Sequence, residues 1–370
     1  MKIVFVSNYP LPYHTPILNA LADRVDLHVI FLSRRHALGS PNDGAYIDQW
    51  GVEPRFTYQF HWSRALRSHG ADFRMQYSMG VSAKLNRLRP DVIFFSSWGP
   101  LMLEPVIWKS LSRRRAVMWA ESTRFSGLLR GGVSNLLRRT ILRQVDAFVT
   151  NGTQATRYLL DLGIDAEIVV TSCLPSEPPG VLTADGVGGQ EVGGKRFLFV
   201  GRLIPRKRPL ELVRAFRRLL ESERDARLTV VGEGPLKTEL EAAAKDADGA
   251  IKLLGRLEGI ELAAVYASHN VLVVPSIREV WGLVVNEALA HGLYVVATDQ
   301  VGSAHDLLDE QTGTIVPAND QAAMISALRD AARLRGLRSR RRAARERVKS
   351  CTAAAFAADL HRAAEIALHA

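Results

Sequence analysis

The stretch NVLVVPSIREVWGLVVNEALAHG (270–292) changes character twice. Its apolar start is typical of a short buried strand. Helix-forming residues follow from Gly282, and Gly292 is the kind of residue that closes a helix. We therefore predict a strand, a tight loop that carries Glu279, and a helix that carries Glu287.

Similar apolar runs recur along the chain, with helical stretches between them. Most are continuous and rich in β-branched residues, as in parallel strands that are buried on both faces. This alternation predicts an α/β fold with two facing, doubly wound, Rossmann-like domains. The predicted strands are 3–8, 25–32, 92–97, 116–121, 147–152 and 167–172 in the first half, and 197–201, 228–232, 251–255, 270–276, 294–298 and 313–317 in the second.

The two halves are separated by 174–195, a segment rich in proline and glycine that lacks periodicity and is typical of a linker. We therefore expect an N-terminal domain at 1–173 and a second domain at 196–348. The alanine-rich end, 349–370, predicts a C-terminal helix that returns across the junction toward the first domain.

The composition is that of a soluble globular protein, with 47% hydrophobic and 23% charged residues among 370. The sequence has no apolar run of membrane-spanning length and leads directly into a strand, so we expect no signal peptide. Cys173 and Cys351 fit neither a disulfide framework nor a metal site. We therefore expect reduced thiols and a cytoplasmic location.

The formal net charge of +10 predicts contact with anions such as phosphates, nucleic acid or an acidic membrane face. Charge alone does not choose among these partners. The basic run 333–349 lacks interleaved aromatic residues, which favours a solvated helix over a nucleic-acid-binding segment.

Glycines and cations follow the predicted strands of the second half, where doubly wound sheets bind ligands. Glycine lets a ligand approach the backbone closely, and two cations at one point suit a diphosphate. The candidates are Gly201, Arg202 and Lys207 after the first of these strands, Glu233 after the second, Arg256 after the third and Glu279 after the fourth.

The predicted helix near Gly282 presents unpaired N–H groups and a partial positive charge at its start, which together make an anion site. At about 1.5 Å of rise per residue, Glu287 lies roughly 7–8 Å along the helix from that start, and Glu279 lies on its other side. A nucleotide sugar has this layout of hexose, diphosphate and ribose. Carboxylates can bind hydroxyl groups at both ends of such a ligand.

These elements together resemble the retaining glycosyltransferases of family four, which have the two-domain GT-B fold. The E-x7-E element of the family corresponds to Glu279-Val-Trp-Gly-Leu-Val-Val-Asn-Glu287, and VGEGP (231–235) is similar to its V-G-x-G-P turn. The resemblance implies that a hexosyl-type sugar moves from a nucleoside-diphosphate sugar to a hydroxyl group, with retained configuration. The implied acceptor is a glycan, a lipid-linked sugar or a small natural product.

The resemblance also implies roles for the matching residues. Arg202 and Lys207 would neutralise the donor diphosphate, and Glu279 would hold the transferred sugar. No metal or other cofactor is implied, and no side-chain base, because the leaving phosphate oxygen can take the acceptor proton. The implied donor-binding residues are Gly201, Glu233, Arg256, Leu257, Trp281, Gly282, Leu283 and Glu287.

The first half departs from the family pattern, because its first loop, SNYPLPYHTP (7–16), lacks the glycine pair of many members. His14 in this loop is either a residue that orients an acceptor hydroxyl or a packing residue. The acceptor-side candidates are Asn8, His14, Trp98 and Glu121.

The stretch 125–145 combines leucines with arginines. This pattern fits peripheral contact with the inner face of an anionic membrane, and it also fits a core helix with arginines outside.

Two other readings stay open at this point. A nucleotide-sugar epimerase or a glycan phosphorylase can share the fold, although neither usually has the E-x7-E element. A basic nucleic-acid-binding or scaffold protein would need positive charge but not Glu279. We expect a nucleotide-sugar donor and an acceptor as partners, and no nucleic acid.

Overall fold

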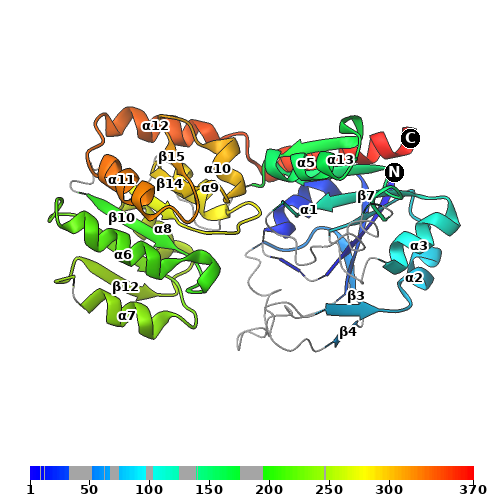
Figure 1. Cartoon of the computed structure of the whole chain (residues 1–370). Coiled ribbons are helices and arrows are strands. Elements are labelled where there is room, and N and C mark those ends of the chain that lie inside the picture. The colour runs from blue at the N-terminus through cyan, green and yellow to red at the C-terminus, as the bar shows by residue number, and fades with distance from the viewer. Residues whose placement is uncertain are drawn as a thin grey trace. The chain divides into compact units, whose positions relative to one another are not determined.

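The computed structural model describes residues 1–8, 10–11, 13–32, 52–61, 63–66, 75–96, 103–124, 139, 141–175, 195–245 and 247–370. Internal contacts divide the chain into two compact units, both drawn in Figure 1. Unit 1 is Met1–Cys173 with Thr352–Ala370, and unit 2 is Leu174–Cys351.

Unit 1 is built on a parallel sheet in the order β3-β2-β1-β6-β7-β8-β9. The side chains of its central strands are buried on both faces, as expected when helices cover a parallel sheet from both sides. The strands are β1 (Lys2–Ser7), β2 (Asp26–Phe31), β3 (Thr57–Phe60), β6 (Val92–Phe95), β7 (Arg115–Ala120), β8 (Ala147–Asn151) and β9 (Val169–Ser172). A separate antiparallel pair consists of β4 (Ser63–Leu66) and β5 (Met75–Ser78).

The predicted C-terminal helix is α13 (Ala353–His369), which belongs to unit 1 and packs on β7, β8, β9 and the first helix. It begins after Thr352, whose hydroxyl accepts a hydrogen bond from the Ala355 amide at 3.1 Å. Its Phe356 ring lies 4.7 Å from that of Trp119. The other described helices of unit 1 include α1 (His14–Ala22), α2 (Val81–Leu88), α3 (Leu103–Ser112) and α5 (Gly152–Asp161).

Unit 2 has a parallel sheet in the order β12-β11-β10-β13-β14-β15. The strands are β10 (Arg196–Val200), β11 (Arg227–Val231), β12 (Ile251–Gly255), β13 (Val271–Val274), β14 (Tyr294–Thr298) and β15 (Gly313–Val316). The helices are α6 (Pro209–Leu220), α7 (Lys237–Lys245), α8 (Gly259–Ala267), α9 (Leu283–Ala290), α10 (Gly302–Leu307), α11 (Gln321–Ala332) and α12 (Leu337–Val348), with a 3-10 turn η3 (Pro205–Lys207) before α6.

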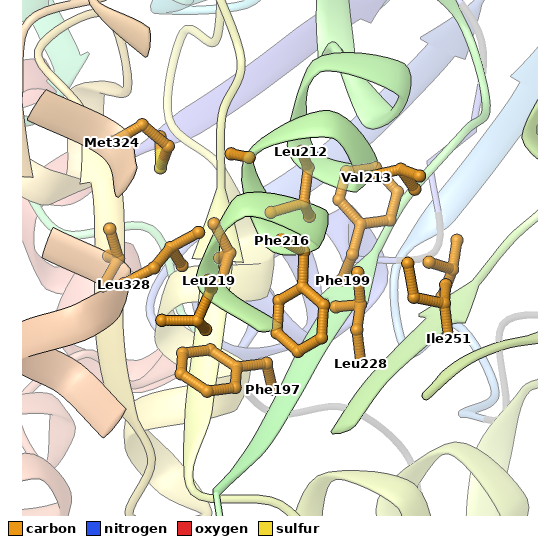
Figure 2. Close-up of a cluster of buried hydrophobic side chains, with 14 of the residues drawn as sticks. Phe197, Phe199, Leu212, Val213, Phe216, Leu219, Leu228, Ile251, Met324 and Leu328 are labelled. Atoms are coloured by element: carbon orange, nitrogen blue, oxygen red, sulfur yellow. The ribbon is translucent and has the colours of Figure 1, made fainter. Parts of the chain in front are cut away.

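The core of unit 2 is a layer of apolar side chains between β10, α6 and α11. Figure 2 shows Phe216 and Leu219 of α6 over Phe197 of β10, with Leu328 of α11 beside them. The Phe197 and Phe216 rings meet edge to face at 5.3 Å, a favoured geometry for aromatic pairs. This packing fixes α6, and therefore the loop that precedes it, against the first strand of the unit.

Both units are doubly wound α/β sheets, as predicted, and every predicted strand is present. The strand order reverses between β1 and β6 in unit 1, and between β10 and β13 in unit 2. Ligands of such sheets bind beside this switch point, at the carboxyl ends of the strands. In unit 2 the switch point therefore selects the loops that follow β10 and β13.

The basic run 333–349 forms α12 over most of its length, and three of its arginines, Arg340, Arg341 and Arg347, donate hydrogen bonds to backbone carbonyls of the protein itself. Nη1 of Arg340 donates to the Glu310 carbonyl at 2.6 Å, and Nη2 of Arg341 donates to the His269 carbonyl at 3.4 Å. Part of the positive charge thus satisfies backbone carbonyls rather than an external anion. Within the described ranges, no helix is both long enough and apolar enough to cross a bilayer.

The expectation of reduced thiols is wrong, because Cys173 and Cys351 are both disulfide-bonded. Cys173 directly follows β9, and Cys351 directly precedes the residue that caps α13. Disulfide formation depends on the distance between two Cα atoms in space, and sequence spacing carries no information on that distance.

Candidate functional site

The two loops at the switch point of unit 2 are tied together by their backbones. The Ile277 amide donates to the Arg206 carbonyl at 2.9 Å, and Nη1 of Arg206 donates to the Arg278 carbonyl at 3.2 Å. These bonds join the loop after β10 to the loop after β13. Residues that are 72 positions apart in the sequence thus form one surface.

An ion pair between Lys207 and Glu279 crosses this junction. The Lys207 ammonium lies 2.7 Å from Oε1 and 2.6 Å from Oε2 of Glu279, and their side chains are only 11% and 15% exposed. The guanidinium of Arg206 lies 3.7 Å from the same carboxylate. Low exposure strengthens such a pair, because water screens it less. The ammonium that was predicted to face a diphosphate therefore also holds in place the carboxylate that was predicted to bind the sugar.

The backbone of Glu279 is held as firmly as its side chain. Its amide donates to the Gln300 carbonyl at 3.0 Å, and its carbonyl accepts from the Gly302 amide at 3.2 Å, which makes an isolated parallel bridge with Val301. The loop is thereby fixed on both sides of the carboxylate.

The helix after this loop begins where the sequence predicts. Gly282 is the N-cap of α9, with φ of 97°, and it has no side chain that could cap the first N–H groups of the helix. A side chain at Gly282 would be strained at this φ, and its Cβ would lie 3.1 Å from Cγ of Glu279. Glycine thus lets the helix start directly beside the carboxylate. Leu283 is the first helical residue and is partly buried.

The side chain of Trp281 has a structural role. The indole is 3% exposed and donates from Nε1 to Oδ1 of Asn286 at 2.8 Å. Nδ2 of Asn286 in turn donates to the Leu174 carbonyl at 2.8 Å. This chain of bonds anchors the residue that precedes Gly282.

Glu287 lies on the second turn of α9, as predicted, and is partly buried. The Tyr266 hydroxyl donates to its Oε2 at 2.6 Å, while its Oε1 has no hydrogen-bond partner in the described part of the chain. Burial raises the pKa of Glu287, and the Tyr266 hydrogen bond opposes that effect. The free oxygen is therefore available to a ligand hydroxyl.

The loops after β10 and β11 pack backbone against backbone. The Leu203 amide donates to the Glu233 carbonyl at 2.8 Å. A Cβ at Gly232 would lie 1.9 Å from the Gly201 carbonyl oxygen, so only glycine fits. The glycines that were predicted for ligand approach thus also serve loop packing.

The remaining donor-side candidates differ in their contacts. Arg202 is exposed, and its side chain forms no ion pair or hydrogen bond with the residues that the structure describes. The guanidinium of Arg256 pairs with Glu258, and Glu233 lies 3.8 Å from Lys237 with 58% of its side chain exposed. Leu257 is partly buried. Among the described residues, Arg202 is therefore a cation that is free to meet a ligand.

Sequence reasoning did not select Arg206 or Tyr266. Arg206 directly precedes Lys207, so the density of cations in RLIPRKR (202–208) was an available signal. Tyr266 lies on α8 and has no motif around it, because its contact with Glu287 depends on how two helices pack.

Unit 1 has a polar cluster at the carboxyl ends of β1, β7 and β8. Oε1 of Glu121, after β7, accepts from the Tyr13 hydroxyl at 3.3 Å and from Nδ2 of Asn151 at 3.4 Å. Oδ1 of Asn151 accepts from Nε1 of the buried Trp119 at 2.8 Å. Burial raises the pKa of Glu121 to about 7, and both hydrogen bonds oppose that shift.

His14, the first residue of α1, is 2% exposed and lies against the rings of Tyr13 at 4.7 Å and Trp119 at 4.6 Å. Neither ring nitrogen has a hydrogen-bond partner in the described part of the chain. Burial lowers the pKa of His14 to about 3, so the ring is neutral near pH 7. Oδ1 of Asn8, after β1, is likewise buried without a partner there.

Two further predictions fall wholly or mainly outside the described residues. Trp98 is not among them, and of 125–145 only 139 and 141–145 are. Leu142 and Val145 at the end of this stretch are buried in the core of unit 1, which agrees with the core-helix alternative for that end.

Residues 194–333 match the family model described as "Glycosyl transferases group 1". The chain is 36% identical over 137 residues to a phosphatidyl-myo-inositol mannosyltransferase of Mycobacterium leprae, and the aligned residues cover 36% of each chain. It is 32% identical over 209 residues to a D-inositol 3-phosphate glycosyltransferase of Stackebrandtia nassauensis, and the aligned residues cover 51% of this chain and 46% of the relative. The chain thus spans less than half the length of these two relatives.

The whole fold resembles a crystal structure of Alr3699/HepE from Anabaena, solved in complex with UDP. The TM-score is 0.72 at 14% identity, over 98% of this chain and 99% of the other. This likeness concerns the fold alone. With the two doubly wound units, it confirms the predicted GT-B fold.

The buried neutral His14 predicts a loss of stability in acid. Between pH 6.5 and about 3 the unfolded chain binds a proton that the folded protein excludes, so stability falls as the pH falls through this range. At pH 5 the loss from this one group is about 2 kcal/mol. Urea unfolding at pH 7 and pH 5 should show that His14→Leu loses about 2 kcal/mol less than the wild type. The exposed His369→Leu is the control and should match the wild type.

The Lys207–Glu279 pair predicts that removing one partner harms the fold. Lys207→Met leaves a poorly exposed carboxylate without its main counter-ion, and we expect a loss of about 2–3 kcal/mol in the free energy of unfolding. Adding Glu279→Gln should restore part of it. Lys237→Met is the control, because its exposed pair with Glu233 should contribute less than about 0.5 kcal/mol. Equal losses for both lysine variants would contradict a structural role for the pair.

Proposed function

We propose that the chain is a retaining glycosyltransferase that moves a hexosyl group from a nucleoside-diphosphate sugar to a hydroxyl group of an acceptor. The observation that carries this proposal is the Lys207–Glu279 pair beside the uncapped start of α9, at the switch point of unit 2. The family match over 194–333 and the UDP bound by a protein of similar fold support it.

In this proposal each group of unit 2 meets one part of the donor. Arg202, Lys207 and the first N–H groups of α9 face the diphosphate, because they are the cations and dipoles at this edge. Glu279 accepts hydrogen bonds from the transferred sugar, and the free Oε1 of Glu287 accepts one from the ribose. The backbone around Arg256 and Leu257 meets the base. Gly201 and Glu233 belong to the loops after β10 and β11, which form the rest of the donor site.

The proposed reaction breaks the bond between the anomeric carbon and the diphosphate oxygen and forms a bond from that carbon to the acceptor oxygen. The leaving phosphate oxygen takes the acceptor proton on the same face, so configuration is retained without a side-chain base. Charge on the leaving group is stabilised by Lys207, Arg202 and the helix start, which is why we propose transfer without a metal.

The acceptor side of the proposal rests on unit 1, with Asn8, His14, Trp98 and Glu121 as candidates. The acceptor is a glycan, a lipid-linked sugar or a small natural product. A cytoplasmic location, with peripheral contact of 125–145 at the inner face of the membrane for a lipid-linked acceptor, is part of the same hypothesis.

Donor binding can be tested without knowing the acceptor. We expect one of the uridine, guanosine, adenosine or thymidine diphosphates to raise the melting temperature, because a ligand that binds the folded state stabilises it. Arg202→Gln should weaken that binding about tenfold through loss of a charge-assisted contact. Arg256→Gln is the matched control. Binding of an oligonucleotide in preference to all four diphosphates would support the nucleic-acid alternative instead.

The proposed catalytic role of Glu279 can be tested by substitution. We expect Glu279→Gln to lower turnover about 100-fold or more while the affinity for the nucleoside diphosphate stays within about twofold, because the carboxylate meets the sugar. The exposed Glu239→Gln, on α7, should keep nearly full activity. Full transfer activity in the Glu279→Gln variant would contradict the proposed mechanism. The same assay in EDTA, with the product anomer assigned by NMR, tests metal independence and retention separately.

A further inference from the structure

The carboxyl group of Glu121 is held in an unusual way. Both of its described hydrogen bonds, from Tyr13 and from Asn151, go to Oε1. Oε2 has no hydrogen-bond partner in the part of the chain that the structure describes, and it is absent from the atoms buried without one. One oxygen is thus fixed by the protein, and the other remains open to a ligand.

The described residues around Glu121 provide no compensating positive charge. Its pKa is shifted by burial and by the hydrogen bonds of Tyr13 and Asn151, with no contribution from any charged side chain. Tyr13 contacts the ring of His14, whose lowered pKa keeps it neutral above about pH 3. An anionic ligand would therefore meet no cation among the described residues and would be repelled by the ionised carboxylate.

A purely structural role does not account for this arrangement. A buried carboxylate without a cation is costly, whereas a glutamine could accept the same two hydrogen bonds through its carbonyl oxygen without any charge. The nitrogens of His14 add a second cost, because buried polar atoms normally have partners. Polar groups that are costly for stability and lie at strand ends are typical of ligand sites.

We propose that unit 1 binds an uncharged, hydroxyl-bearing group, a sugar or a polyol, and that Oε2 of Glu121 accepts the hydrogen bond of one of its hydroxyls. The proposal rests on the proposed function, in which this group is part of the acceptor. It narrows the acceptor class, because the part that meets Glu121 is a neutral polyol and not a phosphate or a carboxylate.

The ionised form of Glu121 is the better hydrogen-bond acceptor, so binding should strengthen as the pH rises through about 7. His14 does not titrate in this range, and Tyr13 and Asn151 are neutral there. The Tyr13 hydrogen bond lowers the pKa of Glu121. Tyr13→Phe should therefore move the midpoint of the pH profile upward, a shift that a structural role alone would not produce.

The experiment measures binding to the full chain by isothermal titration or ligand-observed NMR. The neutral probes are myo-inositol and methyl glucoside, and their charged counterparts are inositol phosphate and glucose 6-phosphate. We expect the wild type to prefer a neutral probe, and Glu121→Gln to weaken its binding about tenfold and remove the pH dependence near 7. The exposed Glu167→Gln in the same unit should behave as the wild type. Melting curves verify that each variant is folded.

The outcomes separate this proposal from the proposed function. Tighter binding of the phosphorylated probes, unchanged binding by a folded Glu121→Gln, or no binding of neutral probes at millimolar concentration would each overturn the neutral-polyol site. Nucleoside diphosphate binding to unit 2 is measured in the same samples. Its absence would overturn the proposed transfer, whereas its presence together with any of those three results would overturn only the inference on Glu121.

Discussion

The ion pair between Lys207 and Glu279 is the contact on which the geometry of unit 2 depends. It joins the loop after β10 to the loop after β13, which are neighbours because the strand order reverses between these two strands. The core under α6 holds one side of the pair, and the bridge between Glu279 and Val301 holds the other. A carboxylate held in this way can bind a sugar without first reorganising, and such preorganisation underlies electrostatic catalysis.

The polar groups at the strand ends have opposite electrostatic surroundings in the two units. In unit 2, Lys207, Arg206 and the start of α9 lie beside one carboxylate, that of Glu279. Unit 1 suppresses charge, because burial disfavours the ionised form of Glu121 and the protonated form of His14. The first environment suits a diphosphate, and the second suits a hydroxyl group. This division would suit the proposed transfer from an anionic donor to a neutral acceptor.

Much of the fold could be predicted from the sequence, because buried parallel strands are continuous apolar runs. The edge strand β3 was missed, since its residues Thr57 to Phe60 are partly exposed and alternate in polarity. The start of α9 could be predicted from Gly282, whereas the contact of Tyr266 with Glu287 could not, because it arises where α8 packs near α9. The disulfide was missed for the same reason: proximity in space leaves no trace in sequence spacing.

The candidate site shows the same limit at the level of single residues. Glu279, Lys207 and Glu287 could be selected from their motif, but the motif does not reveal that Lys207 binds Glu279 directly. Because of that contact, we expect Lys207 to stabilise the fold as well as to neutralise the charge of the proposed donor. Glu121 and His14 could be placed at strand ends, yet their shifted pKa values follow from burial, which a linear sequence does not show. Such residues lower stability, and a protein of marginal stability retains them only where they serve a function.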